Sequence, residues 1–170
     1  MYKDGLQREQ FLPFIDIIKE NSIYKELIIK EDYRKSESYK QERFFFPLNE
    51  ETNFKINQKF RKITKDYKHS IKKLEIKGRI FKINNYYEKF ARFEFNELCN
   101  NYIGAEDYIN IANICNFIVI ENIPLFNESN SNQQQRFITL IDILYEKKVL
   151  LMVSSISDLK NLSSSRSLLD

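Results

Sequence analysis

Glycine is scarce in this chain of 170 residues, which contains only Gly5, Gly78 and Gly104. A phosphate-binding P-loop needs two glycines close together, because its backbone N–H groups must wrap tightly around a phosphate chain. A dinucleotide-binding fingerprint needs three glycines within a single short turn. The three glycines of this chain lie too far apart for either pattern. The sequence therefore excludes both nucleotide-binding motifs within these residues.

Histidine and cysteine are equally scarce. The single histidine, His69, excludes a site with several histidine ligands, and Cys99 and Cys115 lack the close spacing of metal-binding cysteine pairs. The sequence also lacks a Gly-x-Ser-x-Gly segment, so a nucleophile elbow is excluded. We therefore identify no self-contained catalytic apparatus in the chain. We expect both cysteines to be buried small hydrophobic residues.

Long hydrophobic runs are missing as well. The longest apolar runs, such as residues 149–153, are far too short to cross a bilayer. The first residues contain no apolar signal region. Two cysteines do not make a disulfide framework, which is typical of a reducing compartment. We therefore expect a cytoplasmic protein without a transmembrane segment.

The residues that are plentiful indicate a folded chain with uneven charge. Hydrophobic residues make up 42% of the sequence and aromatic residues 14%, too many for a disordered chain. Residues 54–92 contain thirteen lysines and arginines against three acidic residues, whereas residues 93–135 contain no lysine or arginine. The basic region 54–92 could bind an acidic partner or nucleic acid. A solvated lysine-rich surface explains it more simply, and we do not expect nucleic acid binding.

Apolar periodicity predicts both helices and strands in the first 95 residues. Apolar residues at helical spacing indicate two helices, and Asn49 before Glu50 and Glu51 is a typical N-cap for the second. Runs of β-branched and aromatic residues, together with a Lys-Gly turn, indicate strands and a hairpin. The elements expected are helices at residues 11–19 and 49–67, strands at 22–30, 43–48 and 91–95, and a hairpin at 71–83.

The second half of the sequence has the most regular pattern. A helix is expected from about Gly104 to Cys115, and continuous apolar strands at residues 116–120 and 149–153 flank another helix. This arrangement predicts a parallel βαβ unit over residues 116–154. The sequence therefore predicts an α/β fold with an antiparallel, basic hairpin inserted. Polar residues 127–135 are expected to form a surface loop, and residues 156–170 a frayed tail.

Five segments together are more specific than any of these patterns. In chain order they are Tyr2-Lys3-Asp4-Gly5-Leu6-Gln7-Arg8 with Phe11-Leu12-Pro13-Phe14-Ile15, Asp32-Tyr33-Arg34, Ala91-Arg92-Phe93-Glu94-Phe95 with Leu98-Cys99, Gly104-Ala105 with Asp107-Tyr108, and Arg136-Phe137-Ile138-Thr139-Leu140-Ile141-Asp142 with Leu144-Tyr145. In this order they resemble the ZapE family of AAA+-like ATPases, whose eukaryotic relatives are the mitochondrial lactation-elevated-type ATPases. The resemblance extends to about Ser155.

The resemblance implies a partial P-loop-ATPase-like domain. Members of this family carry their P-loop, Walker B residues and sensor-1 segment before the Gly-Leu-Gln-Arg motif, at which this chain begins. Residues 1–155 are therefore expected to be the C-terminal portion of such an ATPase. ATP and Mg²⁺ are the implied cofactors, and we do not expect this chain to bind them alone. The implied partner is a P-loop-bearing N-terminal half or a homo-oligomer of the full-length protein.

Two arginines are candidate site residues. By resemblance, Arg8 lies just after sensor 1, where AAA+ proteins often place an arginine finger that reaches a neighbouring subunit's nucleotide. Arginine suits this role because it is always charged and forks onto two oxygens. The alternative is an ordinary helix-entry residue that pairs with Glu9 or another nearby acid. Arg136 is a candidate nucleotide-binding residue, with a structural role at the start of its helix as the alternative.

The resemblance also implies a function. The family hydrolyses ATP, with links to cell division in bacterial members and to protein quality control in mitochondrial ones, where the matrix would be the compartment. Without a P-loop, this chain would act only by completing a nucleotide site on another polypeptide. The alternatives are a non-enzymatic binding module that uses the basic region 54–92 and a non-functional remnant of a split gene. Arg92 is expected to pair with Glu94 on its own strand rather than to take part in catalysis.

Overall fold

The computed structural model describes residues 43–159 and 161–162 of the chain. The chain divides into two units, Met1–Gln41 and Glu42–Asp170, and every described residue belongs to the second. The helix expected at residues 11–19 and the strand expected at residues 22–30 lie outside the described residues. So does most of the expected tail.

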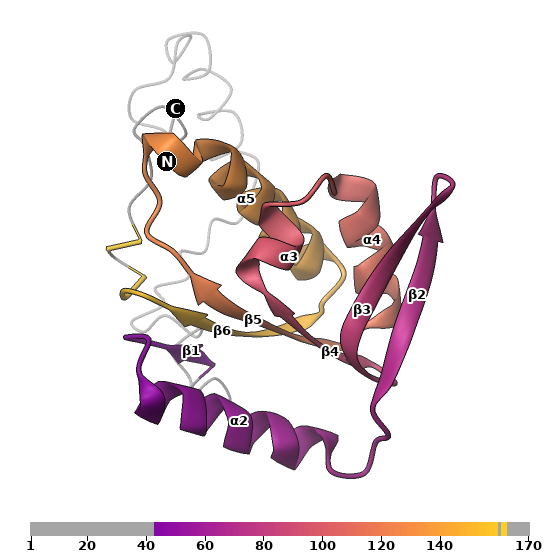
Figure 1. The fold of residues 1–170 in the computed structure, drawn as a ribbon, viewed down its shortest axis with the longest axis horizontal. Coiled ribbons are helices and arrows are strands. Elements are labelled where there is room, and N and C mark those ends of the chain that lie inside the picture. Colours follow the sequence, from indigo (N-terminus) through magenta and orange to yellow (C-terminus); the bar gives the residue numbers. More distant parts are fainter. Residues whose placement is uncertain (1–42, 160, 163–170) are drawn as a thin grey trace, which may run out of the picture. The chain divides into compact units, whose positions relative to one another are not determined.

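Six strands form one mixed sheet. They are β1 (Phe44–Phe45), β2 (Ser70–Ile76), β3 (Arg79–Tyr87), β4 (Phe90–Glu94), β5 (Phe117–Ile123) and β6 (Leu150–Ser155). The strand order is β1-β6-β5-β4-β3-β2 (Figure 1). The first four strands in this order are parallel, and β3 and β2 continue the sheet antiparallel. The predicted α/β class is confirmed, as are the parallel pairing of β5 with β6 and the antiparallel hairpin.

Helices cover both faces of the sheet. Figure 1 shows α3 (Phe95–Cys99), α4 (Ala105–Ile114) and α5 (Ser131–Glu146) on one face and α2 (Glu50–Thr64) on the other. A 3₁₀ turn, η3 (Glu128–Asn130), leads into α5. Within the described part of the chain, no helix combines the length and the apolarity that crossing a bilayer requires.

α2 begins as the sequence predicts. The side chain of Asn49 accepts a hydrogen bond from the backbone N–H of Thr52 at 2.8 Å, and Glu50 and Glu51 occupy the first turn, where the helix dipole favours negative charge. The helix ends at Thr64, three residues before the expected Tyr67. Its buried Ile56 and Phe60 pack against sheet residues in one cluster, whose sheet members are Phe45, Phe117, Val119 and Met152.

The larger core lies between the sheet and the α3–α5 layer. Ile118 and Ile120 of β5 point into it and are fully buried, as is Tyr108 of α4. The rings of Phe95, Phe126 and Phe137 form a cluster beside them, with centroids 5.7 to 5.8 Å apart. Because Phe117 and Val119 of the same strand pack under α2, β5 is buried on both faces, as a central parallel strand must be.

The β2–β3 hairpin has the turn that its sequence indicates. Lys77 and Gly78 both adopt positive φ, at 50° and 76°, between the paired residues Ile76 and Arg79. Two positive-φ residues in a two-residue loop define a type I′ turn, whose twist matches that of the strands. Gly78 meets this demand without the steric cost that a Cβ would bring.

Around Phe95 the structure differs from the expected strand. β4 ends at Glu94, and α3, which periodicity did not predict, begins at Phe95. Glu97 accepts a hydrogen bond from the backbone N–H of Glu94 at 2.8 Å and so caps the new helix. A helix of five residues is too short to leave a periodic pattern in the sequence.

The expected surface loop at residues 127–135 is wrong over most of its length, because η3 and the first turns of α5 occupy it. Asn127 accepts a hydrogen bond from the backbone N–H of Ser129, and Asn130 accepts one from that of Asn127, at 2.9 and 2.8 Å. Asparagine favours such local caps, so a polar, asparagine-rich stretch can start a helix as well as form a loop.

Replacing Ile56 should show how much the packing of α2 contributes to stability. Ile56 is fully buried, whereas Phe54 on the same helix is 66% exposed. We expect Ile56→Ala to lower the free energy of unfolding by about 2–5 kcal/mol, and Phe54→Ala to change it by no more than about 0.5 kcal/mol. Urea unfolding monitored by circular dichroism measures both. Equal losses in the two variants would contradict this placement of α2.

Candidate functional site

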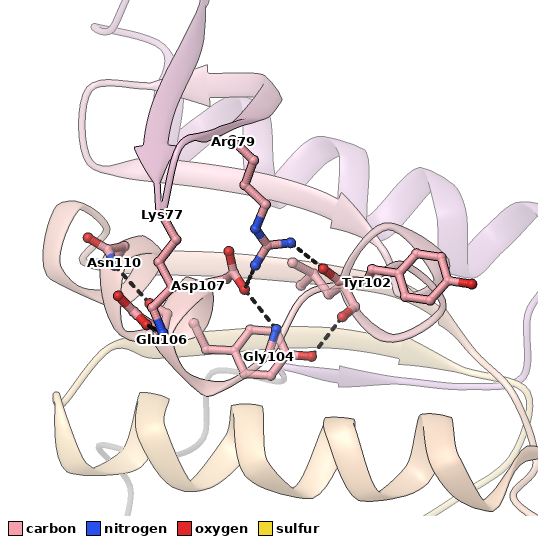
Figure 2. Close-up of polar contacts among 9 residues, drawn as sticks. Lys77, Arg79, Tyr102, Gly104, Glu106, Asp107 and Asn110 are labelled. Atoms are coloured by element: carbon pink, nitrogen blue, oxygen red, sulfur yellow. Dashed lines mark hydrogen bonds and ion pairs between the residues drawn. The ribbon is translucent and has the colours of Figure 1, made fainter.

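One segment that carries the family resemblance, Gly104-Ala105 with Asp107-Tyr108, lies where the tip of the β2–β3 hairpin contacts the α3–α4 connection. Figure 2 shows this place, which we call the Asp107 cluster and define as Arg79, Tyr102, Gly104 and Asp107. Gly104 immediately precedes α4, and Asp107 lies in its first turn. Arg79 is the first residue of β3, directly after the turn. The cluster therefore joins two elements that lie far apart in the sequence.

Asp107 is the centre of the cluster. Its Oδ2 accepts hydrogen bonds from Arg79 Nη2 at 2.5 Å and from the backbone N–H of Gly104 at 2.8 Å (Figure 2). The residue is 1% exposed, and its Oδ1 is buried without a hydrogen-bond partner. Burying a carboxylate is costly unless it is paired and hydrogen-bonded, and the guanidinium of Arg79 meets that need. Arg79 also donates to the backbone carbonyl of Tyr102, which ties the connection to the hairpin.

A second, exposed ion pair flanks the cluster. Lys77, in the hairpin turn, contacts the carboxylate of Glu106, the residue before Asp107 (Figure 2). Their side chains are 72% and 48% exposed, so water screens the attraction. Two adjacent acids thus bind two cations of the hairpin: the buried Asp107 binds Arg79, and the exposed Glu106 binds Lys77.

Side chains from α4 and α5 bond to the last carbonyls of α3. Tyr108 donates its hydroxyl to the carbonyl of Leu98 at 2.8 Å, and Arg136 donates from Nη1 to the carbonyl of Cys99 at 3.0 Å. The carbonyls at a helix C-terminus have no partner within the helix, so these bonds complete α3. Burial raises the pKa of Tyr108 and raises that of Cys99 to about 12.

Arg92 forms a different pair from the one expected. Its Nε and Nη2 donate to the two carboxylate oxygens of Glu121 on the neighbouring strand β5, the second bond being 2.7 Å long. Nη1 donates to the side chain of Asn57 on α2, also at 2.7 Å. The expected Arg92–Glu94 pair is therefore wrong. Glu94 instead accepts from the side chain of Asn122.

The two candidate residues named from the resemblance have different outcomes. Arg8 lies outside the described residues. Arg136 lies in α5, is partly exposed, and binds the end of α3. The structure does not bring Arg136 together with the Asp107 cluster. Sequence reasoning did not single out Arg79 or Glu121. The signal that could have found them is charge, because the pairs Arg79–Asp107 and Arg92–Glu121 each join a cation of the basic region 54–92 to an acid of residues 93–135, which contain no lysine or arginine.

The described residues do not fit ATP or Mg²⁺. Their two glycines, Gly78 and Gly104, lie in a hairpin turn and before α4, so they form no phosphate-wrapping loop. In the same part of the chain, no group of three histidine, cysteine or acidic side chains could hold a metal ion. The carboxylates of Asp107 and Glu121 are each bound by an arginine. The clusters described above therefore stabilise the fold and offer no nucleotide site.

A mostly parallel sheet with helices on both faces is an α/β architecture, consistent with a P-loop-ATPase-like domain. More narrowly, the chain belongs to the AFG1-like ATPase family, whose model matches residues 1–168. It is 31% identical over 152 residues to lactation elevated protein 1 homolog B of Danio rerio; the aligned region is 88% of this chain and 30% of that protein. It is 26% identical over 155 residues to the cell division protein ZapE of Escherichia coli K12; the aligned region is 91% of this chain and 41% of that protein.

The chain thus spans well under half the length of these curated relatives. No solved structure shows a significant match to it.

The two neighbouring acids at the start of α4 provide a matched test of the Asp107 cluster. Asp107→Asn preserves the shape of the side chain but removes the charge that pairs with Arg79, and we expect it to lower the free energy of unfolding by about 1–3 kcal/mol. Glu106→Gln removes only an exposed pair and should lower it by less than about 1 kcal/mol. Thermal and urea unfolding measure both. A larger loss in Glu106→Gln would show that the buried contact is not the stronger one.

The cysteines should be unreactive in the folded protein. Both are buried, and burial raises the pKa of Cys99 and of Cys115 to about 12. Since the thiolate is the nucleophile, a raised pKa leaves almost none of it at pH 8. We expect iodoacetamide to label neither thiol in the native protein and both in urea, as read by mass spectrometry. Rapid labelling of either cysteine in the native state would contradict its burial.

Proposed function

We propose that this chain completes the nucleotide site of an AFG1-like ATPase, while the P-loop that grips ATP and Mg²⁺ lies on another segment or another polypeptide. Membership of the family over residues 1–168, in a sequence whose three glycines cannot form a P-loop, is the observation that carries this proposal. The relatives are much longer than the matched region, which leaves room for a P-loop elsewhere in proteins of this kind. The metal and the triphosphate would thus be held outside these 170 residues.

Arg8 is the residue that we propose acts on the nucleotide. By resemblance it follows the sensor-1 position, and a guanidinium there would contact negative charge on a phosphate held by the partner. Arg136 is a poorer candidate, because its Nη1 already binds the carbonyl of Cys99. In the cell, we propose a role in cell division or a related ATP-driven process, since the Escherichia coli relative is named a cell division protein.

Nucleotide assays on separated polypeptides test this proposal. The purified 170-residue chain should not bind a fluorescent ATP analogue with Mg²⁺. A polypeptide with the P-loop half of the family should hydrolyse ATP faster when this chain is added. Arg8→Ala should remove that stimulation, because loss of an arginine finger lowers the rate by on the order of 10³-fold or more. Arg61→Ala, which removes an exposed guanidinium from α2, is the matched control and should leave the stimulation unchanged.

Two results would contradict the proposal. Tight, magnesium-dependent capture of the ATP analogue by the chain alone would show that it has a nucleotide site of its own. Equal stimulation by the Arg8→Ala and Arg61→Ala variants would show that Arg8 does not contact the nucleotide.

A further inference from the structure

One face of the β2–β3 hairpin is left uncovered by α2. α2 packs on residues of β1, β4, β5 and β6 and meets β3 at Tyr87, the end of that strand farthest from the turn, whereas the rest of the hairpin continues the sheet beyond α2 (Figure 1). Leu74, Phe81 and Ile83 pack in the larger core on the α4 side, and Ile76 beside them in the sequence is also buried. Because side chains alternate along a strand, the residues between them point the other way. We call these residues the outer hairpin face: Ile71, Lys73, Glu75, Ile80 and Lys82.

The outer hairpin face exposes aliphatic side chains. Ile71 is 59% exposed and Ile80 is 64% exposed. Ile80 lies opposite Glu75 near the turn and Ile71 lies toward the other end of β2, so the two isoleucines lie on either side of the Lys73–Lys82 pair. The strands therefore have sheet-forming side chains on a side where no described element packs against them.

The same face places like charges opposite each other. Lys73 and Lys82 are directly paired in the register of β2 and β3, and both are exposed. Like charges directly opposite on a sheet are destabilising. Among the described residues neither lysine forms an ion pair, not even with Glu75, which lies on the same face. The face thus presents an unbalanced pair of positive charges.

Protection of the sheet edge explains these lysines only in part. Lysines on an edge strand discourage other chains from pairing with it, and β2 is an edge strand. Lys82 lies on β3, which pairs with β4 only over Asn85–Tyr87, so the stretch of β3 that carries Lys82 has a neighbouring strand on one side alone. The exposed isoleucines act in the opposite direction, because they favour strand pairing. The pattern fits selection of an acidic partner better than general protection.

The turn determines which backbone groups of β2 face outward. In a two-residue hairpin loop the flanking pair, Ile76 and Arg79, is hydrogen-bonded, and bonded pairs then alternate along the ladder. Leu74 and Lys72 therefore bond to β3. The N–H and C=O groups of Lys73 and Glu75 point to the free edge. The side chains of the same two residues lie on the outer hairpin face.

We propose that an extended acidic segment of another protein adds as a strand along β2. Its backbone would pair with the outward groups of Lys73 and Glu75, with carboxylates near Lys73 and Lys82 and apolar side chains beside the two isoleucines. Antiparallel pairing of two β2 strands about Leu74 would place Lys73 of each copy opposite Glu75 of the other, so elution of the unmodified chain as a dimer in size-exclusion chromatography would assign this edge to a second copy and overturn the proposal. This proposal is independent of the nucleotide role.

A defined peptide tests charge recognition. The probe is a fluorescein-labelled ten-residue peptide of alternating valine and glutamate, and anisotropy of the full 170-residue chain with this peptide reports binding. We expect binding that weakens with added salt and no binding of the peptide with lysine in place of glutamate. Lys73→Glu with Lys82→Glu should weaken binding by about tenfold or more. Lys62→Glu with Lys147→Glu makes the same change of net charge at exposed lysines elsewhere and should have little effect.

A proline substitution separates strand addition from charge attraction alone. Glu75→Pro removes an N–H that points to the free edge and leaves the ladder to β3 intact, so it should abolish peptide binding. Glu75→Gln retains the N–H and should bind at least as tightly as the unmodified chain. Thermal unfolding checks that both variants are folded. If Glu75→Pro does not fold, the comparison of the two double-lysine variants decides the proposal.

Three further outcomes would overturn the proposal. The acidic peptide could fail to bind the unmodified chain. The two double-lysine variants could lose the same affinity, which would indicate attraction by net charge. A folded Glu75→Pro variant could bind as tightly as Glu75→Gln, which would show that the edge of β2 is not used. Tighter binding to anionic phospholipid vesicles or to a 20-nucleotide RNA than to the peptide would assign the face to another class of partner.

Discussion

The central strand β5 is apolar on both faces, and this constraint governs the placement of the other elements. Ile118 and Ile120 need cover on one side of the sheet, and Phe117 and Val119 need it on the other. A parallel strand buried in this way requires helices on both faces. Three helices supply one layer, and α2 supplies the cover described for the other. Since α2 reaches only part of the sheet, the hairpin at the far edge is left with an open face.

The fold also balances charges that the sequence separates. Three ion pairs join a cation of the basic region 54–92 to an acid of residues 93–135, a stretch with no lysine or arginine: Lys77–Glu106, Arg79–Asp107 and Arg92–Glu121. The two arginines bind buried carboxylates: Arg92 donates to both oxygens of Glu121, whereas Arg79 and the backbone N–H of Gly104 donate to one oxygen of Asp107. The balance stops at the outer hairpin face, where Lys73 and Lys82 face each other. Some cations of the basic region 54–92 therefore stabilise the fold through ion pairs, whereas Lys73 and Lys82 form none among the described residues.

The local elements of the fold could be predicted, but its long-range contacts could not. Continuous apolar runs and the Asn49 cap predicted β5, β6 and α2, because these signals depend on neighbouring residues. The partner of Arg92 depends on the register between β4 and β5, which no local pattern encodes. Residues two apart on one strand share a face, which made Glu94 seem the natural partner. The acid that binds Arg92 is instead Glu121 of the neighbouring parallel strand β5, and Asn57 of α2 accepts a further bond from Arg92.

The family resemblance has different meanings in different parts of the chain. In the described unit, the matching residues stabilise structure: Asp107 binds Arg79 and the start of α4, Tyr108 and Arg136 bond to the end of α3, and Cys99 is buried beneath them. Asp107, Tyr108 and Cys99 are buried in these contacts, whereas Arg136 is partly exposed and bonds to Cys99 through Nη1. The match of the three buried residues therefore supports the same fold rather than a catalytic role. Arg8, for which we propose the chemical role, lies outside the described residues.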